Sequence, residues 1–102
     1  MYLVQLLIPL FDNDGHAFES SDYVRLRSGL ADRFGGVTAY TRAPARGVWK
    51  GDSGETTRDD IVIFEVMTAD LDRVWWKEFR QHLEARFRQD TLIVRALTST
   101  LL

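Results

Sequence analysis

The sequence predicts an α+β domain built from two strand–helix–strand halves. Three observations carry this prediction: two stretches with helical spacing of apolar residues, four short stretches rich in β-branched and aromatic residues, and their alternation along the chain in the order βαββαβ. A chain of 102 residues can bury one hydrophobic core. We therefore expect residues 1–102 to form a single domain.

The first half contains a strand, a helix and a second strand. Residues 2–9 are apolar and end at a proline, and the Asp-Asn-Asp-Gly sequence of residues 12–15 is typical of a turn. Apolar residues recur at helical spacing over 20–34, where a serine at position 20 or 21 can cap the helix. Two consecutive glycines then end this helix, and residues 37–42 are predicted to form the second strand.

The second half repeats this order after a longer connection. Residues 45–58 resemble a loop, within which residues 47–50 could form a short strand. Residues 61–67 give the clearest strand, residues 70–89 a long helix with acidic residues in its first turn, and residues 91–97 the last strand. The residues expected on the apolar side of the long helix are Leu71, Val74, Trp75, Phe79, Leu83 and Phe87, with Trp76 at its margin.

The order βαββαβ is that of the ferredoxin-like fold, in which two helices cover one face of a four-stranded antiparallel sheet. In the first strand Val4, Leu6 and Ile8 can face the helices, but Leu3 and Leu7 then point to the opposite face. The third and last strands show the same doubled apolar pattern. A sheet with one solvated face alternates cleanly between apolar and polar residues, so we expect a second copy of the chain to cover the open face.

A group of polar residues interrupts this otherwise apolar second face: Gln5, Tyr40, Arg42, Glu65 and Arg95. Burying a charge without a partner is costly, so Glu65 is expected to pair with Arg95 or Arg42 across the strands. One interpretation is a buried ion-pair network that sets the register of a dimer. The other is a pocket in which Arg42 and Arg95 bind an anionic small molecule while Glu65 or Tyr40 handles a proton. Trp49, an aromatic residue in a glycine-flanked segment, is expected in the wall of this cleft or interface.

With these elements, the sequence resembles the dimeric α/β-barrel group of ferredoxin-like proteins, in which two four-stranded sheets face each other. More locally, residues 34–40, 47–49, 75–76 and 86–90 look like short bacterial proteins of unknown function. The resemblance implies a fold and a homodimer. It implies no particular chemistry, because this group includes monooxygenases, haem-degrading enzymes and ligand-binding regulators.

The remaining candidate residues are histidines and one arginine. His16, beside the turn at residues 12–15, could act as a metal ligand or a proton-transfer group. His82 and Arg86 lie one turn apart on the second helix, where the stem of Arg86 is expected to pack in the apolar sector. Residues 12–15 lack the glutamate that a calcium loop requires, since the position six residues after Gly15 is Ser21. We therefore expect no metal and no cofactor.

The charge and composition of the chain exclude some classes of binding partner. Thirteen basic and fifteen acidic residues give a net charge of −2, which argues against a nucleic-acid-binding module. No stretch is long enough to span a bilayer, so no membrane partner is expected. The absence of cysteine excludes thiolate chemistry and fits a cytoplasmic protein. Two function classes remain: a homodimer that binds or converts a small, partly apolar, anionic molecule on the open sheet face, and a structural or regulatory homodimer whose sheet face is filled by packing.

Overall fold

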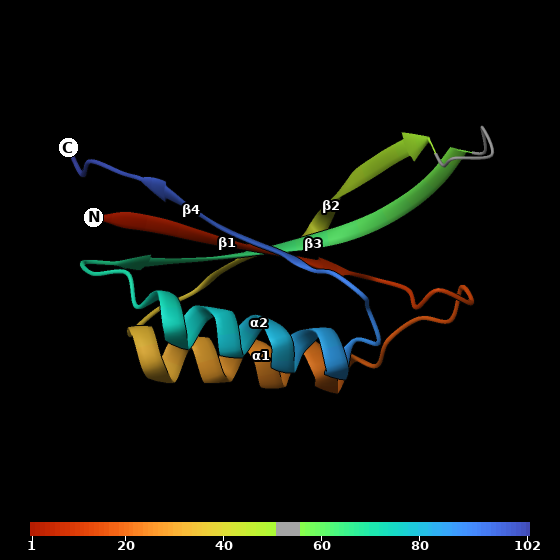
Figure 1. The fold of residues 1–102 in the computed structure, drawn as a ribbon, viewed down its shortest axis with the longest axis horizontal. Coiled ribbons are helices and arrows are strands. Elements are labelled where there is room, and N and C mark those ends of the chain that lie inside the picture. Colours follow the sequence, from red (N-terminus) through yellow and green to blue (C-terminus); the bar gives the residue numbers. More distant parts are fainter. Residues whose placement is uncertain (51–55) are drawn as a thin grey trace.

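The computed structural model describes residues 1–50 and 56–102, and describes side chains for residues 1–40 and 61–102. Four strands form one antiparallel sheet in the order β2-β3-β1-β4, and both helices lie side by side on one of its faces (Figure 1). The elements are β1 (Tyr2–Pro9), α1 (Ser20–Phe34), β2 (Thr38–Lys50), β3 (Thr56–Thr68), α2 (Arg73–Arg86) and β4 (Ile93–Thr98). The sheet is open, not closed into a barrel. This is the ferredoxin-like α+β fold that the sequence predicts.

The helix ends follow from local chemistry. Gly35, with φ of 79°, takes the left-handed conformation after α1 and donates its N–H to the carbonyl of Ala31. Glu19, not a serine, occupies the position before α1, and its side chain makes no capping hydrogen bond. Asp72 caps α2 by accepting a hydrogen bond from the backbone N–H of Trp75 at 3.0 Å. The long helix is shorter than predicted at both ends: its acidic residues lie before its first turn, and it ends at Arg86, three residues early.

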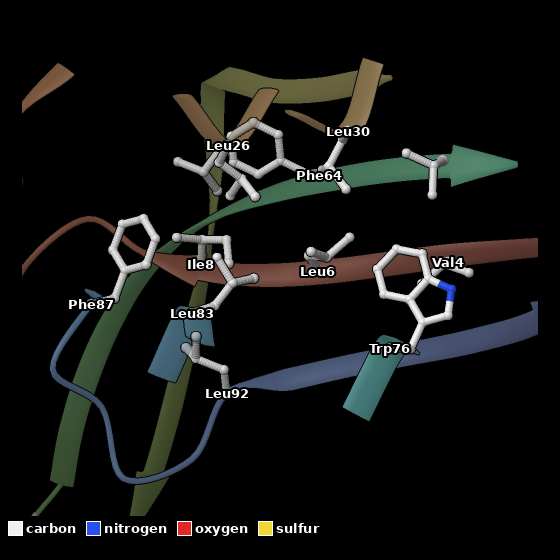
Figure 2. Packing of buried hydrophobic residues seen from close by; sticks show 12 residues of the cluster. Val4, Leu6, Ile8, Leu26, Leu30, Phe64, Trp76, Leu83, Phe87 and Leu92 are labelled. Atoms are coloured by element: carbon white, nitrogen blue, oxygen red, sulfur yellow. The ribbon is translucent and has the colours of Figure 1, made fainter. Parts of the chain in front are cut away.

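The hydrophobic core lies between the sheet and the helices (Figure 2). Alternate residues of β1 and β3 supply one side, and buried residues of α1, α2 and the α2–β4 connection supply the other. The core members are Val4, Leu6, Ile8, Leu26, Leu30, Val62, Phe64, Val66, Trp76, Leu83, Phe87 and Leu92. The predicted face of α2 is wrong at two positions: Trp76 is in the core, while Val74 is 68% exposed.

The hairpin of β2 and β3 is longer than the sequence predicts. Residues 45–50 and 56–58 belong to strands, since Ala45 pairs with Ile61 and Lys50 pairs with Thr56. A register shift lies between Tyr40 and Ala45. Because β2 is an edge strand, a bulge there can accommodate the proline at position 44 without ending the strand.

The face of the sheet opposite the helices carries apolar side chains in the described part of the chain. Leu3 and Leu7 of β1 and Ile63 of β3 are half-buried, whereas Ile93 and Leu97 of β4 are 52% and 47% exposed. Among the described residues, no helix is both long and apolar enough to cross a membrane. Because Ile93 and Leu97 are exposed on it, the open sheet face is the unusual surface of this molecule.

Candidate functional site

A row of hydrogen-bonded polar side chains crosses the open sheet face. Gln5 on the central strand β1 lies in register with Glu65 of β3 on one side and with Arg95 of β4 on the other. The amide nitrogen of Gln5 donates to Oε1 of Glu65 at 2.8 Å. Nε of Arg95 donates to the amide oxygen of Gln5 at 2.8 Å. The register of three strands thus places one anion, one amide and one cation in line.

Both polar atoms of the Gln5 amide form hydrogen bonds in this row. A carboxylate only accepts hydrogen bonds and a guanidinium only donates them. The amide must therefore turn its nitrogen to Glu65 and its oxygen to Arg95, because the flipped orientation would oppose two donors and two acceptors. Gln5 connects two opposite charges through one rigid, oriented group.

Tyr40 extends the row to β2, so that all four strands contribute a residue. Its hydroxyl donates to Oε2 of Glu65 at 3.2 Å, so each carboxylate oxygen of Glu65 accepts one hydrogen bond. The negative charge of Glu65 raises the pKa of the Tyr40 phenol, and the hydrogen bond and partial burial act in the same direction. Tyr40 is therefore a neutral hydroxyl at neutral pH, 48% exposed and able to donate a proton.

Of the two pairings expected for Glu65, the one with Arg95 is not formed directly within one chain. Among the described side chains, these two charges do not come within 4.0 Å of each other, and Gln5 lies between them. The strand order explains this, because β1 separates β3 from β4. Arg42 and Trp49 lie outside the residues whose side chains are described, so their predicted roles stay predictions.

A hollow of about 500 Å³ opens beside Glu65 at the end of the sheet where α1 turns into β2. Leu3, Met67 and Thr38 line it together with the turn at residues 34–37. Gly35 and Gly36, which the sequence identifies only as the end of a helix, also form a wall of this hollow. The sequence contains a signal for this wall, because the chain that leaves a helix packed on its own sheet must pass over the strand ends to enter the next strand. The hollow is mainly apolar and has one charged group.

The turn beside His16 is explained by its own hydrogen bonds. Oδ1 of Asp12 accepts the backbone N–H groups of Asp14 and His16, both at 2.9 Å, and Oδ2 lies 3.4 Å from NH2 of Arg88. The backbone hydrogen bond from His16 is the largest cause of a lowered Asp12 pKa. Asp12, Asp14 and His16 offer ligand atoms within 4.8 Å of one another, but both Asp12 oxygens already have partners. We assign no metal to this turn.

The two weaker candidates on α2 are surface residues. His82 and Arg86 are both exposed. Leu83 and Phe87 are the buried residues at this end of α2, and the expected packing of the Arg86 stem beside them stays a prediction. Neither residue contacts the polar row on the opposite face of the sheet.

Comparisons with known proteins support the fold. No family model and no curated protein matches the chain in sequence. Two solved structures are similar in shape: a phage SAM lyase in complex with S-methyl-5′-thioadenosine and a phage SAM lyase in its apo state. They superpose with TM-scores of 0.65 and 0.63, at 17% sequence identity in both cases. Each match covers 94% of this chain, and 79% and 78% of the respective lyase chains. At this identity the likeness establishes a shared ferredoxin-like architecture.

Proposed function

We propose that this protein is a small cytoplasmic homodimer that binds a small, partly apolar molecule with an anionic group on its open sheet face. The observation that carries the proposal is the row from Arg95 through Gln5 to Glu65 and Tyr40. Binding sites for small molecules combine an apolar lining with a few oriented polar groups. The row supplies such groups at the centre of an apolar face.

Each member of the row has a chemical role in this proposal. Among the described residues, the guanidinium of Arg95 bonds only to Gln5 and only through Nε, and its terminal nitrogens would hold the anionic group of the ligand. Glu65 is held by two donors and accepts a hydrogen bond or a proton from the ligand. Tyr40 donates a hydrogen bond through its neutral hydroxyl, since its raised pKa keeps the proton on the phenol at neutral pH.

The dimer is supported by the apolar surface around the row. Met67, Ile93 and Leu97 are 38%, 52% and 47% exposed on one face. Contiguous apolar patches on a protein surface mark interaction sites, and a second copy facing the first would give a dimeric α/β barrel. The ligand cleft then lies between the two sheets.

The two phage SAM lyases provide the probes for a test, since one of them binds S-methyl-5′-thioadenosine. Isothermal titration with SAM, whose carboxylate supplies the anionic group, is expected to show saturable binding, and S-methyl-5′-thioadenosine, which has no anionic group, is expected to bind more weakly. Glu65→Gln removes the negative charge of the row and is expected to weaken SAM binding by about 10-fold, the loss of one charge-assisted hydrogen bond. Glu78→Gln, on the exposed side of α2, makes the same chemical change and should leave binding unaltered.

The alternative function is a structural or regulatory dimer whose sheet face is closed by packing. Analytical ultracentrifugation separates the two: a dimer that binds neither probe favours the alternative, and a monomer at micromolar concentration contradicts both. Ile63→Asp should dissociate the dimer without reducing helix content, because Ile63 lies on the open face. Chromatography of samples incubated with SAM distinguishes conversion from binding alone.

A further inference from the structure

A second hollow lies at the opposite edge of the sheet, between the edge strand β4 and helix α2. Its volume is about 410 Å³, within the range of small-molecule pockets. Val4, Trp76 and Val94 form an apolar floor, and Figure 2 shows the indole of Trp76 beside Val4. The residues that line it include basic side chains but no acidic one in the described part of the chain. This α2–β4 groove is separate from the hollow beside Glu65.

Three cations of α2 line the groove. Arg73, Lys77 and Arg80 follow one another at spacings of four and three residues, so they share one side of the helix over about 10 Å. Among the described side chains, neither Arg73 nor Lys77 has a carboxylate within 4.0 Å. Arg73 is also the first residue of α2, where the helix dipole is positive and disfavours a cation. The charges of Arg73 and Lys77 are therefore not neutralised by any described residue, and Arg80 has only Glu84, at 3.9 Å.

Arg80 provides an independent indication of a missing acceptor. Its Nε atom is shielded from solvent and makes no hydrogen bond in the structure. Oε1 of Glu84 lies 3.9 Å away, which is too far for a hydrogen bond, and Oε2 of Glu84 accepts the backbone N–H of Leu92 at 2.9 Å. A shielded donor without an acceptor is unfavourable. The Arg80 side chain as a whole is 37% exposed, so an anion in the groove contacts its terminal nitrogens, and Nε gains an acceptor when the guanidinium turns toward that anion.

We propose that the α2–β4 groove binds an organic anion. Its apolar body lies on Trp76 and Val94, and its phosphate or carboxylate group is held by Arg73, Lys77 and Arg80. The apolar floor favours a ligand with a ring-sized hydrophobic part over a bare inorganic ion. The three cations favour an anionic headgroup over a neutral polar one. Arg95 of the polar row also lines the groove, so this site shares one residue with the open sheet face but differs from it in its apolar floor and in the three cations of α2.

The probe is 1-naphthyl phosphate, which combines an aromatic body with a phosphate. Isothermal titration is expected to show tighter binding than with 1-naphthol, which lacks the charge, and with inorganic phosphate, which lacks the body. The comparison with 1-naphthoate identifies the preferred headgroup. In nitrogen–proton spectra, the Arg80 Nε–H resonance should move downfield as it gains an acceptor, and the Trp76 indole resonance should shift in the same titration.

Charge variants locate the binding. Arg73→Gln with Lys77→Gln changes two exposed residues and is expected to weaken binding of 1-naphthyl phosphate by about 10-fold or more. The matched control, Arg25→Gln with Arg27→Gln on the exposed side of α1, removes the same net charge and should leave affinity unchanged.

Four outcomes would overturn the proposal. The first is no saturable binding of 1-naphthyl phosphate or 1-naphthoate, and the second is an equal loss of affinity in the control, which would indicate diffuse electrostatic attraction. The third is a shift of the Gln5 amide resonance with none at Trp76, which would place the ligand on the open face. The fourth is a change of sedimentation mass in the Arg73→Gln, Lys77→Gln variant, which would show that a second copy fills the groove. The wild-type Arg80 resonance keeps the test valid if either variant folds poorly.

Discussion

The Gln5 amide makes a specific energetic prediction about the two charges that it connects. In the eight combinations of Gln5→Met, Glu65→Met and Arg95→Met, we expect the Gln5–Glu65 coupling to be about 1–2 kcal/mol, at the lower end for a half-buried hydrogen bond to a charge. The Gln5–Arg95 coupling should be about 0.5–1 kcal/mol, because Arg95 is exposed. Any coupling between Glu65 and Arg95 should disappear once Gln5 is replaced.

The size of that residual coupling follows from the strand geometry. Glu65 and Arg95 are two strand spacings apart, about 9.6 Å. At this separation two unit charges interact by about 0.4 kcal/mol in water, and screening at physiological salt reduces the interaction to about 0.15 kcal/mol. This value is below the resolution of a mutant cycle.

Urea unfolding followed by Trp fluorescence, at one fixed protein concentration, measures all eight free energies of unfolding. The fixed concentration is needed because assembly contributes to apparent stability. A Glu65–Arg95 coupling above about 0.5 kcal/mol in the Gln5→Met background would refute the reasoning, because that value exceeds the resolution of the cycle. It would mean that the two charges meet directly or across a subunit boundary.

Three further predictions concern the fold. Phe87 is fully buried, and its ring centroid lies 5.0 Å from that of Phe18. Phe87→Ala should lower the free energy of unfolding, measured in urea, by about 3–5 kcal/mol, whereas Phe11→Ala, at a 44% exposed position, should lower it much less. Burial, and then the charge of an adjacent aspartate, raises the pKa of Tyr23 to about 12, so Tyr23 contributes stability below pH 10 that is lost between pH 10 and pH 12. Tyr23→Phe should remove this step from a pH series of thermal unfolding. Gly35→Ala should lower the free energy of unfolding by about 1–2 kcal/mol, because Gly35 has a positive φ. Gly36→Ala, at a position without this constraint, is the control.

The sequence predicted the architecture because the strand and helix periods are strong over most of the chain. Alternation in residues 2–9 and 61–67 assigned the correct face to each side chain, and the two helices were found at nearly their true positions. Alternation also brought Gln5, Tyr40, Glu65 and Arg95 to one face. These are local signals, and a residue's face follows from its position in the strand.

The parts that failed depend on information beyond local spacing. The hairpin of β2 and β3 continues through a proline because β2 is an edge strand, which only the strand order reveals. The face of α2 is an exception, because helical spacing alone places Trp76 within about 20° of the buried Leu83 and Val74 about 180° from it. The link through Gln5 required the cross-strand register, because an amide between two charges has no signature along the chain.

The position of Arg95 also bears on the behaviour of the protein at high concentration. β4 is a short edge strand, and Arg95 is the only charged residue between Ile93 and Thr98. Exposed strand edges template the pairing of further chains, and a charge in a short edge strand opposes this. Replacing Arg95 by an apolar residue therefore has a consequence that dilute unfolding experiments do not record. It leaves an apolar strand with a free edge, and light scattering during concentration is where the resulting aggregation should first become visible.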